Sequence, residues 1–154
     1  MNEELLMNSL FAYTEESMWL KGTNTFCITK DRKALLSQGN EIWDKEKELD
    51  FDEYNEVKRI VDDYKELLKD LPEELDDGEY IIMDGSSYEI YVDGQKFVTD
   101  LAAIHYEADE NQIITEEDKE IDKHRKAQKM LHEMMTRIEH EVGIKFDYNK
   151  KIDD

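Results

Sequence analysis

Apolar and polar residues fall into periodic blocks along this 154-residue chain, and the spacing within each block predicts its secondary structure. The clearest block follows Asp50-Phe51-Asp52-Glu53, which has the pattern of a helix capping box. Apolar residues then recur at alternating spacings of three and four, the period of an amphipathic helix, at Tyr54, Val57, Val61, Tyr64, Leu68 and Leu71. The sequence therefore predicts a long helix that ends near Pro72.

A second helical block occupies the C-terminal part of the chain. Thr115-Glu116-Glu117-Asp118 can cap its N-terminus, with acidic residues placed favourably against the helix dipole. Gly143 suits the position just beyond its C-terminus, because glycine tolerates a positive φ angle. We expect a charged loop before this helix and an apolar stripe along it, formed by Ile121, Leu131, Met135, Ile138 and Val142.

Between the two helices, the period changes to that of β-strands. Asp-Gly pairs at 77–78, 84–85 and 93–94 supply the positive φ angles of two-residue hairpin turns and predict a three-stranded meander from Glu79 to about Leu101. Alternation puts one set of side chains on a core face: Ile81, Met83, Tyr88, Ile90, Val92 and Phe97. The opposite face is mixed, and we expect it to lie half under a helix or to meet a partner: Tyr80, Ile82, Glu89, Tyr91, Lys96 and Val98.

The remaining segments have weaker patterns. Residues 3–17 have the spacing of a short amphipathic helix, and Met18-Trp19-Leu20 can pair with 25–29 across Gly22-Thr23-Asn24. We also expect a helical turn at 31–37 and an edge strand at 146–148. Together the pattern predicts a single α+β domain spanning residues 1–154. Its antiparallel β-meander of three to five strands packs against two long amphipathic helices plus a short N-terminal helix.

Charge is concentrated in two segments. The chain has 40 acidic and 20 basic residues, a formal net charge of −20. Glu41–Glu79 holds 17 acidic and 6 basic residues, and Asp100–Asp122 holds 9 and 1, so they carry −11 and −8 of the total. A clustered excess is less readily explained by solubility alone than an even one. The basic runs at 123–129 and 145–151 are short and embedded in acid, which argues against direct binding of nucleic acid.

The sequence offers few candidates for catalysis or metal binding. His124, His132 and His140 recur every eight residues, so successive rings rise about 12 Å along the helix and cannot share one metal ion. Glu120 and His124 have suitable spacing as a pair, but two ligands do not make a site, and His124 lies on the apolar seam. Phosphate loops, nucleophile elbows and dinucleotide fingerprints are missing from the sequence. We expect a protein that is not an enzyme and uses no cofactor or metal.

Two further features of the sequence indicate the cellular compartment of the protein. Cys27 is the only cysteine and lies in an apparent strand, where a buried thiol behaves as a small apolar side chain. The longest uncharged stretch near the N-terminus, residues 5–13, is too short to span a bilayer and has no basic flank. We therefore expect a cytoplasmic protein without membrane association.

These observations favour a stoichiometric inhibitor that binds a basic partner protein. It would be an immunity protein against a nuclease-like toxin, or a phage-type anti-defence protein that mimics nucleic acid and occupies the channel of a nucleic-acid-binding complex. Carboxylates along the first long helix would imitate phosphates, and tyrosines would anchor the interface. The candidate partner-binding residues are Glu46, Glu48, Asp52, Asp62, Asp63, Glu66, Asp70, Tyr80 and Tyr91, and Tyr54 and Tyr64 belong to the same aromatic set.

Other interpretations remain open. The acidic residues are equally compatible with a solvated face, with Tyr54 and Tyr64 in the core. A non-catalytic structural or adaptor protein, a homodimer formed through the helix face at 54–71 or 121–142, is the alternative from another class. A small enzyme assembled from residues distant in sequence is the third.

Overall fold

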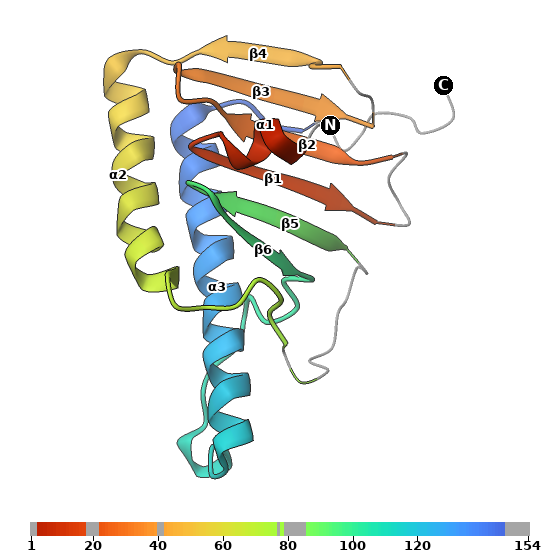
Figure 1. Ribbon diagram of the computed structural model, residues 1–154, viewed down its shortest axis with the longest axis vertical. Coiled ribbons are helices and arrows are strands. Elements are labelled where there is room, and N and C mark those ends of the chain that lie inside the picture. The colour runs from red at the N-terminus through yellow and green to blue at the C-terminus, as the bar shows by residue number, and fades with distance from the viewer. Residues whose placement is uncertain (1–2, 18–21, 40–41, 77, 79–85, 147–154) are drawn as a thin grey trace.

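In the computed structural model, a four-stranded meander is followed along the chain by a helix, a hairpin and a second long helix (Figure 1). The structure describes residues 3–17, 22–39, 42–76, 78 and 86–146. The elements in chain order are α1 (Glu3–Met7), β1 (Phe11–Glu16), β2 (Asn24–Ile28), β3 (Lys33–Gln38), β4 (Lys45–Glu48), α2 (Phe51–Leu68), β5 (Ser87–Val92), β6 (Gln95–Thr99), the 3-10 helix η1 (Glu110–Gln112) and α3 (Glu116–Val142). The predicted α+β class is confirmed, with six strands where three to five were expected.

The six strands form one antiparallel sheet in the order β4-β3-β2-β1-β5-β6. The first four strands pair with their neighbours in sequence, and the chain then crosses through α2 before β5 pairs with the free side of β1. The strand nearest the N-terminus is therefore one of the two central strands of the sheet (Figure 1).

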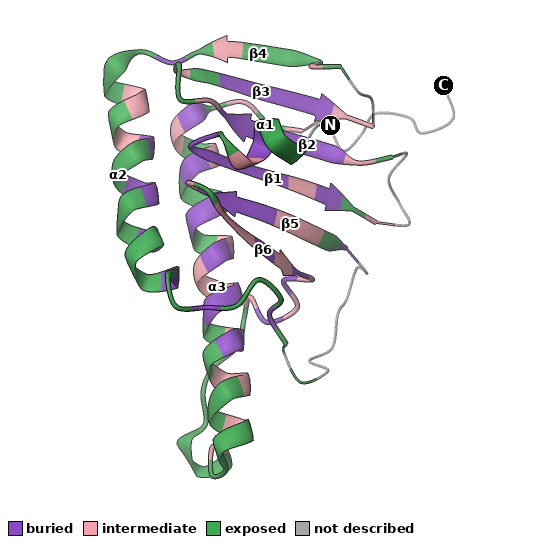
Figure 2. Cartoon of the chain, in the orientation of Figure 1, coloured by how far each residue is buried: buried purple, intermediate pink, exposed green. Residues whose placement is uncertain are grey.

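The two long helices cover one face of this sheet, and α1 lies on the opposite face (Figure 1). The main core lies between the sheet and the long helices, and Figure 2 shows the buried sides of α2 and α3 turned toward it. Most of the apolar stripes predicted from the sequence lies in this core, with Val57, Ile60, Val61, Tyr64 and Leu68 from α2 and Leu131, Met134, Met135, Ile138 and Val142 from α3. Ile121, the first residue predicted for the α3 stripe, is instead half-buried outside this core. Both stripes are thus part of the intramolecular packing. A smaller apolar cluster under α1 contains Leu6, Ala12, Cys27, Leu35 and Tyr91.

Both helix starts agree with the sequence prediction. The Asp50 carboxylate accepts from the Glu53 N–H at 2.8 Å, and Glu53 accepts from the Asp50 N–H at 3.1 Å. Thr115 and Asp118 form the same reciprocal pair at the start of α3, and Gly143 ends that helix with a φ of 79°. These capping groups satisfy backbone N–H groups that have no partner within the helix.

Two N-terminal predictions are wrong. The helix expected to reach residue 17 ends at Met7, and β1 follows from Phe11. The turn expected at 31–37 is mostly β3. In both strands, residues on each side are buried because the long helices cover one face and α1 with Trp43 packs on the other, so the apolar run shows no clear period of two.

The strand that pairs with β2 also differs from expectation. Thr25 lies opposite Thr14 of β1, whereas the sequence suggested pairing with Met18-Trp19-Leu20, which lies outside the described residues. The hairpin at Asp93-Gly94 is confirmed, since both residues have positive φ and Val92 lies opposite Gln95. Its predicted core residues Tyr88, Ile90, Val92 and Phe97 contact the main core. The third strand expected at 79–83 and the edge strand expected at 146–148 fall wholly or mostly outside the described residues.

Both edges of the sheet are protected. Beside β6, the Val98 N–H donates to the Glu73 carbonyl at 2.7 Å, and the Leu75 N–H donates to the Val98 carbonyl at 3.2 Å. The other edge strand, β4, reads Lys-Glu-Lys-Glu. Charged edge strands and covered edges both oppose pairing with another chain.

Candidate functional site

The predicted row of carboxylates does not lie on one helix. Glu46 and Glu48 belong to β4, and Glu46 lies opposite Leu35, whose side chain is on the α1 face of the sheet. Because neighbouring residues across a sheet share a face, both glutamates point away from the side that α2 covers. The prediction that they extend the helical row is therefore wrong.

The remaining predicted carboxylates do project from α2 and the turn after it. Asp52, Asp62, Asp63, Glu66 and Asp70 are all exposed, and we call them the α2 acidic row. Basic residues compensate part of it: Arg59 lies 3.2 Å from Asp63, and Lys69 lies 2.6 Å from Glu66 and lowers the pKa of that carboxyl group through the hydrogen bond. Six acidic and three basic residues give α2 a net charge of only −3.

The predicted tyrosine anchors are not on this surface. Tyr91 is 1% exposed, lies in the cluster under α1, and donates its hydroxyl to Glu89 at 3.1 Å. Tyr64 is in the main core, and Tyr54 is half-buried against it. Tyr80 lies outside the described residues. The core interpretation of Tyr54 and Tyr64 is thus the one that the packing supports.

The second acidic segment forms a projection. The N-terminal part of α3 extends beyond the sheet, and the preceding loop, with η1 in it, folds back along this end of the helix (Figure 1). Figure 2 shows that this end is largely exposed. Residues 107–120 contain seven acidic residues and one lysine, a net charge of −6, and we call this segment the acidic tip.

Two carboxylates of the acidic tip stabilise its shape. The Asp118 carboxylate accepts from the backbone N–H groups of Thr115, at 3.0 Å, and Ile114, at 3.2 Å, and these bonds lower its pKa. Asp109 caps η1 by accepting from the Asn111 N–H at 3.0 Å. In contrast, Glu107, Glu110 and Glu117 are exposed and form no ion pair with any described residue. These three carboxylates are available to a partner.

The acidic tip also offers apolar surface. Ile114 is 75% exposed, more than any other large apolar side chain among the described residues. Beside it is a pocket of about 250 Å³, with Tyr106, Ile113 and Ile121 among its apolar walls and Asp109, Asp118 and Asp122 among its carboxylates. Within this pocket Tyr106 donates to Asp122 at 2.6 Å and lies beneath the Arg125 guanidinium, 5.3 Å from its ring centre.

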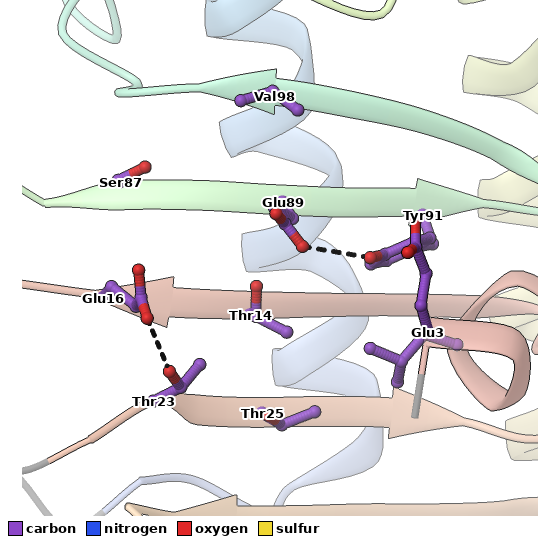
Figure 3. A pocket seen from close by; sticks show the side chains of 10 residues that line it. Glu3, Thr14, Glu16, Thr23, Thr25, Ser87, Glu89, Tyr91 and Val98 are labelled. Carbon is purple, nitrogen blue, oxygen red and sulfur yellow. Dashed lines mark hydrogen bonds between the residues drawn. The ribbon is translucent and has the colours of Figure 1, made fainter. Parts of the chain in front are cut away.

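A second pocket, of about 320 Å³, lies on the α1 face of the sheet and was not predicted from the sequence. Thr25, Thr14 and Glu89 form one row across β2, β1 and β5, and Glu16 and Ser87 form part of the next row. We call this cavity the sheet-face pocket, and Figure 3 shows these side chains lining it. Strand pairing brings them together from distant parts of the chain, which is why no motif marks them.

His124 and Glu120, which the sequence spaces as a possible pair of ligands, lie next to each other in the structure. His124 is 6% exposed, consistent with its predicted place on the apolar seam, and its Nδ1 accepts from the Asp76 N–H at 2.8 Å. Its Nε2 lies 3.3 Å from Glu120, without hydrogen-bond geometry. Among the described residues, no three His, Cys, Asp or Glu side chains are grouped so that they could hold a metal ion.

A buried polar cluster lies between the sheet and α3. Tyr13 donates its hydroxyl to Glu139, and Tyr88 donates to Glu15 at 2.7 Å. Burial raises the pKa of Glu139, the hydrogen bond from Tyr13 opposes this rise, and the nearby Glu15 carboxylate adds to it. The two carboxylates therefore share a partly desolvated environment at one end of β1.

Comparison with known proteins adds no assignment. The sequence matches no protein-family model and no curated protein sequence. The described helices include none that has the length and apolar character needed to cross a bilayer.

Proposed function

We propose that this protein is a stoichiometric inhibitor that binds a basic protein partner through its acidic tip. The partner would be a nuclease-like toxin, with this chain as its immunity protein, or a nucleic-acid-binding complex whose channel the acidic tip occupies as a nucleic-acid mimic. The observation that carries the proposal is the projection of seven carboxylates, only one lysine and the exposed Ile114 beyond the sheet.

The acidic tip suits this role better than the α2 acidic row. Arg59 and Lys69 already pair with members of the row, so a basic partner would have to displace them. Glu107, Glu110 and Glu117 require no such displacement. Uncompensated carboxylates on a projection would accelerate encounter with a cationic surface, and this steering would weaken with added salt.

Apolar contact would supply the affinity that charge alone does not. Burial of Ile114 would remove an exposed aliphatic side chain from water, a gain of about 1.5–3 kcal/mol for a side chain of this size when fully buried. The pocket beside it is large enough to accept a side chain of the partner. An apolar anchor inside a charged rim is the arrangement found at many protein interfaces.

The proposed setting is the cytoplasm. Cys27 is buried and unpaired, and burial raises the pKa of its thiol to about 11. A thiol held in its protonated form is poorly reactive, and a chain with a single unpaired cysteine fits a reducing compartment.

Affinity capture with charge-reversed variants tests the proposal. The protein is immobilised and exposed to lysate of its native cell and of competing strains or phage-infected cells, and the basic protein that it retains is purified and titrated against it. The Glu110→Lys/Glu117→Lys variant should bind this partner at least tenfold more weakly. Asp62→Lys/Asp70→Lys is the matched control, because it produces the same change of net charge from −20 to −16 in the α2 acidic row.

Three results would overturn the proposal. These are retention of no basic protein at low salt, equal loss of binding in both double variants, and a partner whose activity is unchanged when it is saturated. If a partner is retained, competition with duplex DNA distinguishes a nucleic-acid mimic from an immunity protein. A nucleic-acid mimic would be displaced by DNA, whereas an immunity protein that binds outside the nucleic-acid groove would not.

A further inference from the structure

We propose that the sheet-face pocket binds a small organic cation with two ammonium groups. The pocket lies on the opposite side of the sheet from α2 and α3, is built from different residues from those of the acidic tip, and does not depend on the function proposed above. Its charge, its hydroxyl groups and the strand pairing that assembles it all favour such a ligand.

Charge selects a cation. Three carboxylates line the pocket, from Glu3, Glu16 and Glu89. Lys96 lies 2.9 Å from Glu3 and 3.9 Å from Glu89, so one ammonium group serves both of these acids. Glu16 accepts a hydrogen bond from the Thr23 hydroxyl at 2.9 Å and meets no cation among the described residues. The pocket and Lys96 together carry two negative charges more than positive ones.

Hydroxyl groups form the floor of the pocket. Thr25 lies opposite Thr14, and Thr14 lies opposite Glu89, so that the three side chains stand side by side on neighbouring strands (Figure 3). Thr25 is only 2% exposed, and no hydrogen bond joins its hydroxyl to another described residue. An ammonium group only donates hydrogen bonds, so the oxygen of this hydroxyl could accept one from an ammonium group in the pocket.

Strand geometry places the two acids at a useful separation. Glu16 lies opposite Ser87, and Glu89 follows two residues later on the same face of β5. The Cα atoms of such diagonal neighbours across an antiparallel pair are roughly 7–8 Å apart. Two ammonium groups joined by a short aliphatic chain can therefore reach both carboxylates, with the chain lying near Leu6, Tyr91 and Val98 in the apolar part of the wall.

Titration with putrescine tests this proposal. Putrescine is added to the ¹⁵N-labelled protein at low ionic strength, to about 10 mM, which covers weak binding. We expect saturable shifts of the Thr14, Thr25 and Glu89 amide signals. Butane-1,4-diol, which has the same length and no charge, should leave these signals in place. Equal shifts with the diol, or no saturable shift with putrescine, would overturn the proposal.

Paired variants separate a site from general attraction to an acidic protein. Glu16→Gln/Glu89→Gln should weaken putrescine binding at least tenfold. Glu46→Gln/Glu48→Gln also removes two carboxylates from the same side of the sheet and gives the same net charge of −18, and it should bind as the original protein does. Equal weakening in both would assign the binding to the overall field and refute the site.

Two more variants complete the test. Thr25→Val preserves shape while removing the hydroxyl, and it should weaken binding several-fold; unchanged binding would contradict the role given to Thr25. The Glu110→Lys/Glu117→Lys variant of the acidic tip should still bind putrescine at the sheet-face pocket. Failure of one proposal is thereby distinguished from failure of the other. Circular dichroism establishes that each variant is folded before its titration.

Discussion

Glu139 is a carboxylate placed where α3 and the sheet exclude much of the surrounding water. Its neighbour Glu15 is also acidic, and hydrogen bonds from Tyr13, Tyr88 and Asn24 offset part of the cost of burying the two groups, as does the positive charge of Lys145 near Glu139. Because burial raises the pKa of Glu139, the folded protein holds this proton more tightly than the unfolded chain does. Its ionisation therefore destabilises the fold as pH rises above the ordinary glutamate value of 4.5.

Glu139→Gln should stabilise the protein at pH 7 and have little effect at pH 4. The amide oxygen can still accept from Tyr13, while the buried charge is removed, and we expect a gain on the order of 1 kcal/mol. Urea denaturation at both pH values measures the difference. Glu133→Gln, which changes an exposed glutamate of the same helix, should show no such dependence on pH. A loss of stability at pH 7 in Glu139→Gln would mean that the charged form is the favoured one.

At the scale of whole elements, Lys47 connects three of them. It lies on β4, its ammonium group donates to Glu53 in the first turn of α2 at 2.7 Å, and it also donates to the Val142 carbonyl at the end of α3, at 2.7 Å. One side chain thus satisfies a helix C-terminal carbonyl and holds the start of α2 near the end of α3.

Lys47→Met should destabilise the fold by about 1–2 kcal/mol, because two charge-assisted hydrogen bonds are lost while the aliphatic stem is preserved. The midpoint of urea denaturation measures this loss. Lys33→Met is a suitable control, since Lys33 forms an exposed ion pair with Glu46 at 3.7 Å, and such pairs contribute little. Equal losses of stability in both variants would show that the hydrogen bonds of Lys47 contribute no more than an exposed ion pair does.

The elements also show which parts of the fold are readable from the sequence. Both long helices were predicted closely, because the signals at Asp50, Thr115 and Gly143 are local and their stripes face a single core. β1 and β3 were misread because both of their faces are covered, which hides the strand period. Burial of Tyr91 depends on where α1 lies, and the sheet-face pocket depends on strand pairing, so neither follows from spacing along the chain.

Over the whole molecule, the net charge of −20 acts against the folded state. Ion pairs such as those of Arg59 and Lys69 offset it locally, but carboxylates outnumber cations two to one. Salt reduces the range of this repulsion from about 30 Å at 0.01 M to about 8 Å at 0.15 M. The segregation of charge into two segments was evident in the sequence, whereas the projection of only one of them is a tertiary property.

The melting temperature should therefore rise as sodium chloride is increased from 0.01 to 0.15 M. The rise should be smaller in Glu110→Lys/Glu117→Lys, because this variant lowers the net charge to −16. Scanning calorimetry at the two salt concentrations measures both effects. A fall in melting temperature with salt would instead show that favourable ion pairs dominate the electrostatics of the fold.

The position of β1 within the sheet has a consequence for the order of folding. Its pairing with β2 joins residues that are close in sequence, whereas its pairing with β5 joins residues 71 to 81 positions apart. Contacts between distant residues form slowly because a long loop must close first. During synthesis, one side of β1 therefore stays open until residue 92 has left the ribosome, and we expect the docking of the β5–β6 hairpin to be the late, rate-limiting step.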